Sequence, residues 1–474
     1  VGGAVRRLLL RLPQGVLDQP QDELPLGYLP SLALTLAGQI ILDPLEQVLA
    51  DLKCHCSRLC HVVFSSVFIV VGEQFRDVLA EGLVCRDALR RHPGMQGFRD
   101  LAVWFHAASL GEFEQGRPLM ERIRKDNPQY KILLTFYSPS GYEVRKNYEG
   151  ADIICYMPVD TRLNAIRFLR LVRPVMAFFI KYEFWSNFLH ILKHRNIPTY
   201  SVSSIFREDQ VFFKWYGRSY AGVLKCFTRF FVQNEESKRL LEGIGITAVD
   251  VVGDTRFDRV LQIKEAAKQL PICEAFRTGV ASSQSADVPH HDFKVFVAGS
   301  SWPPDENIFI PFFNEHKDWR LLIAPHVIAE EHLKLILSLI KGKKVVRYTQ
   351  TTPEEAAEAD VLIIDCFGLL SSMYNYGDVA YIGGGFGVGI HNTLEAAVWN
   401  MPVIFGPNNK KFQEAQGLLK SGGGFEINTY EDFSGLMSSL MNDETFLKQA
   451  GDKAGAFVAH LAGATDKVLA SVKL

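Results

Sequence analysis

The stretch that decides the fold is residues 101–136, which read LAVWFHAASLGEFEQGRPLMERIRKDNPQYKILLTF. Its two apolar runs, LAVWFH at 101–106 and KILLTF at 131–136, enclose an amphipathic segment at 114–125. Apolar strands that alternate with helices are typical of βαβ units, whose parallel sheet is covered by helices on both faces. This stretch therefore predicts an α/β fold that starts near residue 101.

The alternation continues on both sides of a break at about residues 263–292, which reads as a loop or linker. We predict a poorly defined segment at 1–95 that could associate with a membrane, and two Rossmann-like domains at 96–275 and 276–474. The two domains are expected to face each other across a cleft, where ligands bind at the carboxyl ends of the strands. Beyond the first two, strands are predicted at 153–157, 175–180, 199–203, 229–232, 294–298, 320–324, 344–348, 361–364, 379–382 and 402–405.

The composition excludes several classes of protein. With 474 residues, 47% apolar and 22% charged, the chain can form ordinary cores. A formal net charge of −2 argues against a general nucleic-acid binder. The apolar run at 62–71 is too short for a bilayer, which needs ~20 residues. A cysteine and histidine cluster at 54–61 could bind zinc, but it lacks paired C-x-x-C spacing, so unpaired thiols are the favoured interpretation.

The motif HAASLGE, from His106 to Glu112, directly follows the first strand. A carboxylate at this position suits a general base that deprotonates an attacking hydroxyl. Ser109 and Glu112 also have the spacing of a capping box, in which Glu112 only satisfies backbone N–H groups. Both interpretations are open, and a capping carboxylate tends to be held ionised, as a base requires.

The motif AGSSWPPDE at 298–306 follows the first strand of the second half. Gly299 would let the backbone approach a ligand, and Ser300 and Ser301 would offer hydroxyl and N–H groups at a helix N-terminus, which is an anion site. An N-cap followed by prolines in the first turn is an equally good interpretation.

The segment IGGGFGVGIHNTLE at 382–395 contains five glycines before a predicted helix. Such a loop can wrap a phosphate, and the density of glycine favours this interpretation because glycine costs stability. It is neither a Walker loop nor a G-x-G-x-x-G fingerprint. Glu395 could hold a ribose diol, or Asn392 and Glu395 could form a capping box. The polar cluster FGPNNKKFQEA at 405–415 lies at the same expected edge, or is an ordinary turn before a helix.

Two further features concern partners. Residues 206–231 interleave basic and aromatic side chains, which suits a membrane interface or a phosphorylated lipid, or else an amphipathic helix with inward aromatics. No Asp-x-Asp occurs in the sequence, although metal-dependent users of nucleoside diphosphate sugars usually present such carboxylate pairs. A reaction without metal or cofactor is therefore predicted.

Together these motifs resemble the transferases that attach 3-deoxy-D-manno-octulosonic acid (Kdo) to the lipid A precursor of lipopolysaccharide. The resemblance covers about residues 101–474, although the first ~75 residues do not resemble the family's membrane-anchoring segment. The resembling motifs, in order, are HAASLGE, VVGDTRFD at 251–258, AGSSWPPDE, APH at 324–326, GGGFGVGIHNTLE and FGPNNKKFQEA.

The resemblance implies a GT-B glycosyltransferase that moves Kdo from CMP-Kdo to a sugar hydroxyl of lipid IVA, with inversion. The first domain would bind the acceptor and the second the donor, at the cytoplasmic face of the bacterial inner membrane, by peripheral or N-terminal attachment. Glu112 would be the catalytic base. The resemblance also implies donor contacts by Ser300, Ser301, Pro325, His326, Gly385, Asn392 and Glu395, and acceptor-side places for Glu183 and Arg256.

Two rival functions are weighed against this one. One is a GT-B enzyme that uses another nucleotide sugar, or a related epimerase; a comparison of donors would separate these. The other is a nucleotide-binding or membrane-docking protein without activity. The glycine-rich loop together with a carboxylate on the opposite domain disfavours the second rival, since a pure binder has no need of such a carboxylate.

Overall fold

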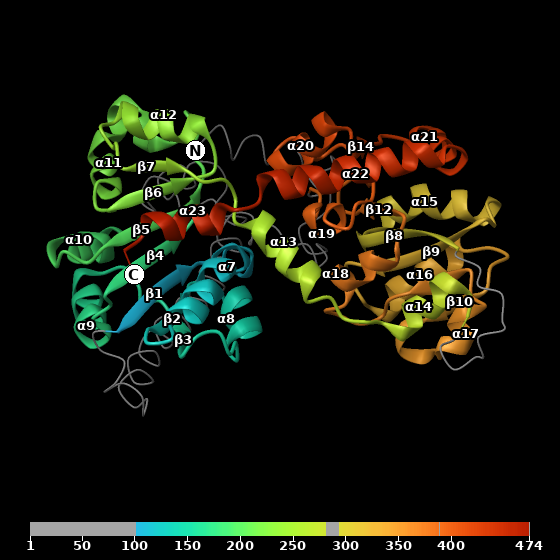
Figure 1. Cartoon of the computed structure of the whole chain (residues 1–474), viewed down its shortest axis with the longest axis horizontal. Helices are drawn as coiled ribbons and strands as arrows, with labels where there is room; N and C mark the ends of the chain where they lie inside the picture. The colour runs from blue at the N-terminus through green and yellow to red at the C-terminus, as the bar shows by residue number, and fades with distance from the viewer. Residues whose placement is uncertain (1–100, 281–292, 388, 474) are drawn as a thin grey trace, which may run out of the picture. The chain divides into compact units, whose positions relative to one another are not determined.

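The computed structural model describes residues 101–280, 293–387 and 389–473 and contains two seven-stranded parallel sheets (Figure 1). The predicted N-terminal segment and the possible zinc cluster lie outside the described residues. The described chain divides into two compact units. The smaller contains Cys155–Arg173 and Trp185–Ile191, and the larger contains both sheets except for the end of β3. The predicted α/β class, with two Rossmann-like sheets, is confirmed.

The first sheet has the strand order β3-β2-β1-β4-β5-β6-β7. From β1 the chain runs outward to β3 and then returns past β1 to β4, so that the strand order reverses beside β1. Ligands of open α/β sheets bind at such a reversal. The strands are β1 (Ala102–Ala107), β2 (Lys131–Phe136), β3 (Ile153–Tyr156), β4 (Met176–Ile180), β5 (Thr199–Ser204), β6 (Arg229–Val232) and β7 (Val249–Val251). The helices are α7 (Leu110–Asp126), α8 (Pro139–Arg145), α9 (Arg162–Val172), α10 (Ser186–His194), α11 (Arg218–Leu224) and α12 (Glu235–Gly243), with 3-10 turns η1 (Val211–Phe213) and η2 (Trp215–Gly217).

The second sheet has the order β10-β11-β9-β8-β12-β13-β14, which differs from the first in that its fourth strand, β11, lies between β9 and β10. Its strands are β8 (Lys294–Ser301), β9 (Trp319–Pro325), β10 (Val345–Arg347), β11 (Val361–Ile363), β12 (Val379–Ile382), β13 (Val403–Phe405) and β14 (Gly424–Glu426). The helices from the linker onward are α13 (Arg256–Glu265), α14 (Pro271–Thr278), α15 (Pro303–Glu315), α16 (Glu330–Leu339), α17 (Pro353–Ala357), α18 (Leu370–Met373), α19 (Leu394–Ala397), α20 (Gln413–Ser421), α21 (Tyr430–Asn442), α22 (Glu444–Leu461) and α23 (Ala464–Ser471), with 3-10 turns η3 (Tyr348–Gln350) and η4 (Tyr374–Tyr376).

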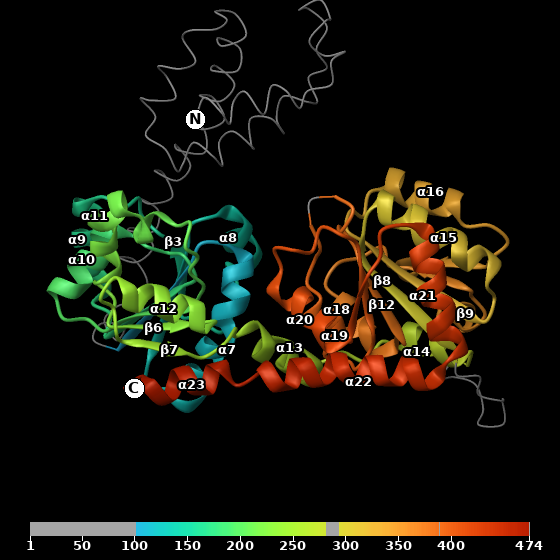
Figure 2. The same ribbon diagram turned by 90° about the horizontal axis from the view of Figure 1, so that it is seen from above.

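Alternate residues of the central strand β8 enter two different cores. Val295 and Val297 pack with residues of α13, α14, α19, α20 and α22, whereas Phe296 and Ala298 pack with residues of α15, α16 and α21. Figure 2 shows α15 and α21 on one side of β8 and β12, and α18 and α19 on the other. A strand buried on both faces must be apolar at every position, which explains the continuous apolar runs in the sequence.

The twelve predicted strands all occur, but three short elements were missed. Strands β7 and β14 have three residues each, VDV and GFE, and a charged residue or a glycine interrupts the apolar run in each, so no strand pattern stands out. The segment predicted as a linker contains α14, whose first helical residue is Pro271 and which ends at Gly279 in the left-handed conformation. None of the described helices is long and apolar enough to cross a bilayer.

Helix α23 belongs to the core of the first sheet, although it follows the whole of the second sheet in sequence. Ala464 and Val468 pack in the same cluster as Val103 and Phe105 of β1. The carboxylate of Asp258 accepts hydrogen bonds from the backbone N–H groups of Gly463 and Thr465 and from the Thr465 hydroxyl. Asp258 therefore caps the N-terminus of α23 and fixes it in place.

Loss of this cap is expected to weaken the fold. Asp258→Ala should lower the stability by about 0.5–2 kcal/mol, because N-terminal N–H groups of α23 lose their acceptor. The thermal unfolding midpoint and the protease sensitivity of α23 would measure the effect. Asp466→Ala is the matched control, since Asp466 lies in the same helix but forms only an exposed ion pair with Arg122. Equal midpoints for both variants would contradict the capping role.

Candidate active site

The carboxyl ends of β1 and β4 bring together the residues of the predicted catalytic motif. The two strands are paired in parallel, with His106 of β1 opposite Phe179 of β4. Glu112 lies in the first turn of α7, just after β1, and Glu183 lies just after β4. Helix α7 lies close to the end of β4, because a Cβ on Gly116 would be 3.0 Å from the Ile180 side chain. The predicted base and the predicted acceptor-side glutamate are therefore neighbours.

Glu112 does form the capping box that the sequence allows. Its Oε2 accepts the backbone N–H of Ala108 at 2.6 Å and that of Ser109 at 3.3 Å. Burial nevertheless raises the pKa of Glu112 above its usual range, and the nearby Glu183 raises it further; the Ala108 N–H, Lys181 and His106 act in the opposite direction. The cap lowers the pKa as expected, but desolvation and the like charge of Glu183 outweigh it. A raised pKa suits a general base, whose proton affinity should be near the working pH.

His106 fixes the position of Glu183 through a buried polar chain that the sequence analysis did not assign. Its Nε2 lies 3.0 Å from Glu183 Oε2, and its Nδ1 lies 2.8 Å from the Thr135 hydroxyl. Trp104 Nε1 donates to the same hydroxyl at 2.9 Å. A carboxylate oxygen accepts hydrogen bonds, so the Nε2–H group of His106 donates to Glu183 Oε2. The sequence contains one signal of this role, because a polar histidine ends the otherwise apolar run LAVWFH.

Three residues other than glycine have left-handed backbones at strand ends. They are Lys181 after β4, Ser203 in β5 and Ser300 in β8, with φ of 58°, 55° and 53°. This conformation costs energy for residues with a Cβ and persists only where surrounding contacts enforce it, which happens most often at functional sites. The strain therefore marks the carboxyl edge of both sheets.

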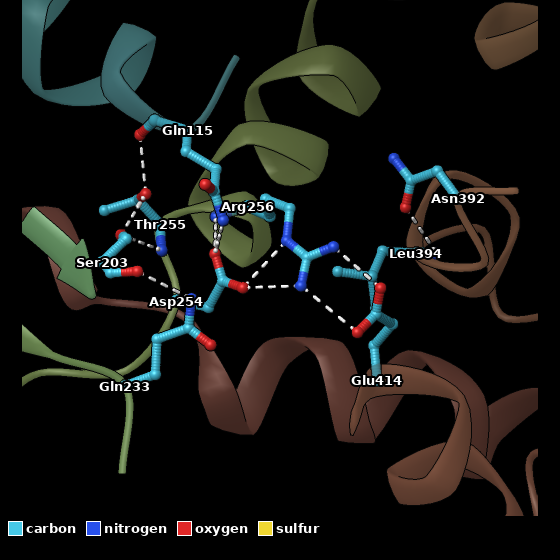
Figure 3. A network of polar contacts seen from close by, with 9 residues as sticks. All are labelled: Gln115, Ser203, Gln233, Asp254, Thr255, Arg256, Asn392, Leu394 and Glu414. Carbon is cyan, nitrogen blue, oxygen red and sulfur yellow. Dashed lines mark hydrogen bonds and ion pairs between the residues drawn. The ribbon is translucent and has the colours of Figure 1, made fainter. Parts of the chain in front are cut away.

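Arg256 is held between two carboxylates (Figure 3). Its Nε donates to Asp254 at 2.8 Å, and its Nη1 and Nη2 donate to Glu414 at 2.7 and 3.2 Å. Both carboxylates are nearly buried, and their charges raise the pKa of Arg256 although burial opposes this. A substrate anion that contacts Arg256, as the sequence predicted, would therefore have to compete with Asp254 and Glu414 for its N–H groups.

The same network continues to the first sheet (Figure 3). Gln115 Nε2 donates to Asp254 at 3.1 Å, and the Thr255 hydroxyl donates to the backbone oxygen of Gln115 at 2.6 Å. The Ser203 hydroxyl lies 2.8 Å from that of Thr255. These buried bonds hold the segment after β7 against α7 and the end of β5. They therefore fix the backbone that carries the Arg256 side chain.

The two serines after β8 differ in what they can offer a ligand. Ser300 is half-buried, whereas Ser301 is fully buried and its hydroxyl donates to Glu306 at 2.8 Å. Pro303 and Pro304 carry no N–H, and the Trp302 N–H donates to Asp305 at 2.9 Å. The start of α15 is therefore a weaker anion site than the sequence suggested, with Ser300 as its exposed polar group.

The glycines of the loop after β12 are required by close backbone packing. A Cβ on Gly383 would lie 2.2 Å from the Ser300 oxygen, and one on Gly385 would lie 2.5 Å from the Gly406 nitrogen. The Gly384 N–H donates to the buried Asp305 at 2.9 Å. The loop thus joins the ends of β8, β12 and β13, and its glycine content has a structural cause in addition to the predicted ligand.

Three rings from different strand ends form a stacked cluster beside this loop. His326, which follows Pro325 at the end of β9, stacks on Trp302 at 4.7 Å and on His391 at 4.4 Å between ring centroids. The Trp302 indole donates to His391 Nε2 at 3.3 Å, which requires that nitrogen to be unprotonated. Burial and the neighbouring His326 lower the pKa of His391 in agreement. The sequence analysis singled out His326 but missed Trp302 and His391.

Asn392 and Glu395 lie side by side at the start of α19. Asn392 Nδ2 donates to Glu395 Oε1 at 2.9 Å, and its Oδ1 accepts the Leu394 N–H at 3.1 Å. Burial raises the pKa of Glu395, while the Asn392 hydrogen bond lowers it. The two side chains thus form local hydrogen bonds at the N-terminus of α19. They follow the loop that contains Gly385.

The aromatic residues of segment 206–231 divide into two groups. Phe206 and Phe230 are buried and pack against one another and their neighbours. Trp215, Tyr216 and Tyr220 are exposed by 83%, 60% and 62%. The inward-packing interpretation therefore holds for the phenylalanines but not for η2 and the start of α11.

Known proteins resemble this chain in sequence. The model of the family described as 3-deoxy-D-manno-octulosonic-acid transferase (kdotransferase) matches residues 83–259. The 3-deoxy-D-manno-octulosonic acid transferase of Aquifex aeolicus is 26% identical over 73% of this chain and 88% of its own length. The transferases of the same name from Haemophilus influenzae and Rickettsia prowazekii are each 24% identical, over 78% and 73% of this chain and 86% and 73% of their own lengths.

Solved structures resemble the chain in fold. The UDP-GlcNAc 2-epimerase of Neisseria meningitidis covers 78% of this chain and 98% of its own, with a TM-score of 0.53 and 15% identity. The enzyme of that name from Methanocaldococcus jannaschii covers 76% and 99%, with a TM-score of 0.50 and 15% identity. At such identities the likeness concerns the fold alone. The family match and these relatives support a 3-deoxy-D-manno-octulosonic-acid transferase, and together with the fold they make the chain a glycosyltransferase of the GT-B type.

Proposed function

We propose that the chain transfers Kdo from CMP-Kdo to a sugar hydroxyl of lipid IVA, with inversion at the anomeric carbon. The observation that carries this proposal is the place of Glu112, a carboxylate of raised pKa at the carboxyl end of β1. Glu112 would take the proton of the acceptor hydroxyl as that oxygen attacks the anomeric carbon and CMP leaves. A base on the acceptor side is what a single in-line displacement requires, because no covalent sugar–enzyme intermediate forms.

We assign the acceptor to the domain at 96–275 and the donor to the domain at 276–474. On the donor side, the half-buried Ser300 and the loop around Gly385 would hold the phosphate of CMP. The ring of His326, with Pro325 behind it, would lie near the cytosine, and Asn392 with Glu395 near the ribose. Ser301 would act mainly by holding Glu306, since its hydroxyl is already donated. Negative charge that develops on the leaving phosphate would then meet fixed dipoles instead of water.

The donor is tested by supplying the purified full chain with lipid IVA and either labelled CMP-Kdo or labelled UDP-sugars. We expect transfer from CMP-Kdo only, and NMR of the product should show the anomeric configuration opposite to that of the donor. Transfer from a UDP-sugar without transfer from CMP-Kdo would sink the proposal in favour of the rival nucleotide sugar.

We also propose that the exposed aromatics of η2 and α11 contact the inner-membrane surface that contains the acceptor. Trp and Tyr are the side chains preferred at a bilayer interface, and the exposed Arg207 and Lys225 belong to the same segment. Trp215→Ala should weaken binding to phosphatidylglycerol vesicles about tenfold, because burial of a large apolar side chain contributes about 1.5–3 kcal/mol.

Sedimentation with vesicles would measure this binding. Phe367→Ala is the matched control, since Phe367 is 79% exposed but follows β11 of the second sheet. Equal losses in both variants would contradict a specific role for η2. A higher salt concentration should weaken binding of the wild type to the vesicles, because salt screens the attraction between the basic residues and the anionic lipid.

A further inference from the structure

Lys181 has a backbone that is fixed in an unusual conformation. It follows the last residue of β4 with a left-handed φ of 58°. Its N–H donates to the Val202 oxygen at 2.9 Å, and its oxygen accepts the Ser204 hydroxyl at 2.9 Å. The neighbouring strand β5 therefore holds both backbone groups, and the direction of the Lys181 side chain is set by the sheet and not by a free loop.

The ammonium of Lys181 differs from the other cations near this edge. Arg256 is paired with Asp254 and Glu414, and Arg259 donates to Glu114 at 2.8 Å. Lys181 is half-buried, yet its ammonium forms no ion pair or hydrogen bond with any residue in the described part of the chain. A partly desolvated cation without a partner costs stability, which is typical of a group that pairs with a ligand.

The charges around Lys181 come from three helices and from the segment between β7 and α13. Glu112 of α7, Asp254 before α13 and Glu414 of α20 attract its proton, whereas Arg256 of α13 repels it. Burial is the largest influence and lowers the pKa of Lys181 below its usual range. Glu183, two residues further along, adds a second carboxylate beside Glu112.

The chemistry of the transferred sugar requires a cation at this place. Kdo is a 2-ulosonic acid, so its carboxylate is bonded directly to the anomeric carbon at which substitution occurs. A base that reaches the attacking hydroxyl lies within a few bond lengths of that carboxylate. Glu112 and Glu183 would repel it, because like charges in a partly buried site raise each other's energy. Lys181 is the cation beside Glu112 that the structure leaves without a pairing carboxylate.

We propose that Lys181 binds the carboxylate of the transferred acid sugar beside Glu112. This inference rests on the proposed function, since it takes Glu112 as the base. The ammonium would draw the acid donor into a site that otherwise repels it and would orient the anomeric carbon toward the acceptor oxygen. It would also identify the sugar, because a neutral hexose offers no carboxylate to this position.

The test uses the full chain with Lys181→Met, which keeps the stem without the charge, and Lys181→Arg, which keeps the charge. Free Kdo and CMP serve as separate probes, titrated by ligand-observed NMR. Lys181→Met should weaken Kdo binding about 10- to 100-fold and leave CMP binding unchanged, as expected for loss of a partly buried charged hydrogen bond. Lys181→Arg should retain most of the binding.

The pH dependence gives a readout that a structural role would not move. Kdo binding to the wild type should be complete while Lys181 is protonated and should be lost as the pH rises through its lowered pKa. In Lys181→Arg this alkaline loss should disappear, because a guanidinium stays charged. Thermal midpoints would show whether the variants fold. If Lys181→Met does not fold, the pH dependence of Kdo binding to Lys181→Arg still tests the inference.

Three outcomes would overturn the inference. They are Kdo binding that is unchanged in Lys181→Met, no binding of Kdo to the wild type, and weakened CMP binding with normal Kdo binding, which would assign Lys181 to the phosphate. Failure of the proposed function looks different. In that case the wild type would transfer no sugar from CMP-Kdo, while Kdo binding would still depend on Lys181.

Discussion

Replacement of Glu112 by glutamine is expected to lower the rate of sugar transfer ~10²–10⁴-fold, the usual effect of removing a general base. The amide oxygen can still accept the N–H groups of Ala108 and Ser109, so the cap of α7 and the fold should be retained. The amide cannot take a proton from the acceptor hydroxyl. Initial rates of transfer to lipid IVA, with the thermal midpoint of each protein, would measure both effects.

Glu355 provides the control for this substitution. It is the equivalent capping-box glutamate of α17, with Thr352 N–H bound to its Oε2 at 3.3 Å, but it is exposed and follows a different sheet. Glu355→Gln should leave the rate unchanged. Near-normal transfer by a folded Glu112→Gln would reduce Glu112 to a helix cap.

The rate of the wild type should also depend on pH through Glu112. The base acts only when ionised, so the rate falls as the pH drops through the pKa of Glu112. Because burial and Glu183 raise that pKa, the loss should occur above ~4.3, the usual value for glutamate. An acid limb at the ordinary glutamate pKa would contradict the buried environment.

Gly383→Ala is expected to destabilise the protein by about 1–3 kcal/mol or more, the cost of overpacking a core. The added Cβ would lie 2.2 Å from the Ser300 oxygen and 2.6 Å from the Ser301 Cα, and both are backbone atoms that cannot rotate away. The strand end that carries Ser300 would have to move. CMP binding should therefore weaken together with the fall in thermal midpoint.

Gly387 is the matched control within the same loop. It is exposed, its φ is not positive, and a Cβ there would have only an ordinary contact at 3.8 Å. Gly387→Ala should therefore keep both the midpoint and the CMP affinity. Equal tolerance of both alanines would show that the loop adapts and that glycine is not required at 383.

The sequence predicted the elements that depend on local pattern. Buried parallel strands read as apolar runs because both faces are covered, and this identified every strand longer than three residues. The capping spacing of Ser109 and Glu112 was correct for the same reason, since both partners lie within one helical turn. The raised pKa of Glu112 could not be predicted in the same way, because the charge of Glu183 comes from the end of another strand.

The features that the sequence could not give depend on distant partners. The ion pair of Arg256 with Glu414 joins residues 158 positions apart, so no local sequence pattern around Arg256 predicts it. Glycine density in the 383–389 loop was correctly noticed, but a sequence does not show what a Cβ would meet. The Ser300 and Gly406 backbones supply that answer only once the strands are assembled.

The bond between Asp258 and Gly463 has a consequence for biosynthesis. It joins residues 205 positions apart, and the ribosome must translate the entire second sheet between them. Domains usually fold in turn as they emerge. Here the first sheet emerges early, but the core that it shares with α7 stays incomplete until Ala464 and Val468 have been made. The sheet that is synthesised later can thus be complete almost as soon, and the nascent first sheet would expose apolar residues that chaperones bind. A fragment cut at the linker would lack that part of its core permanently.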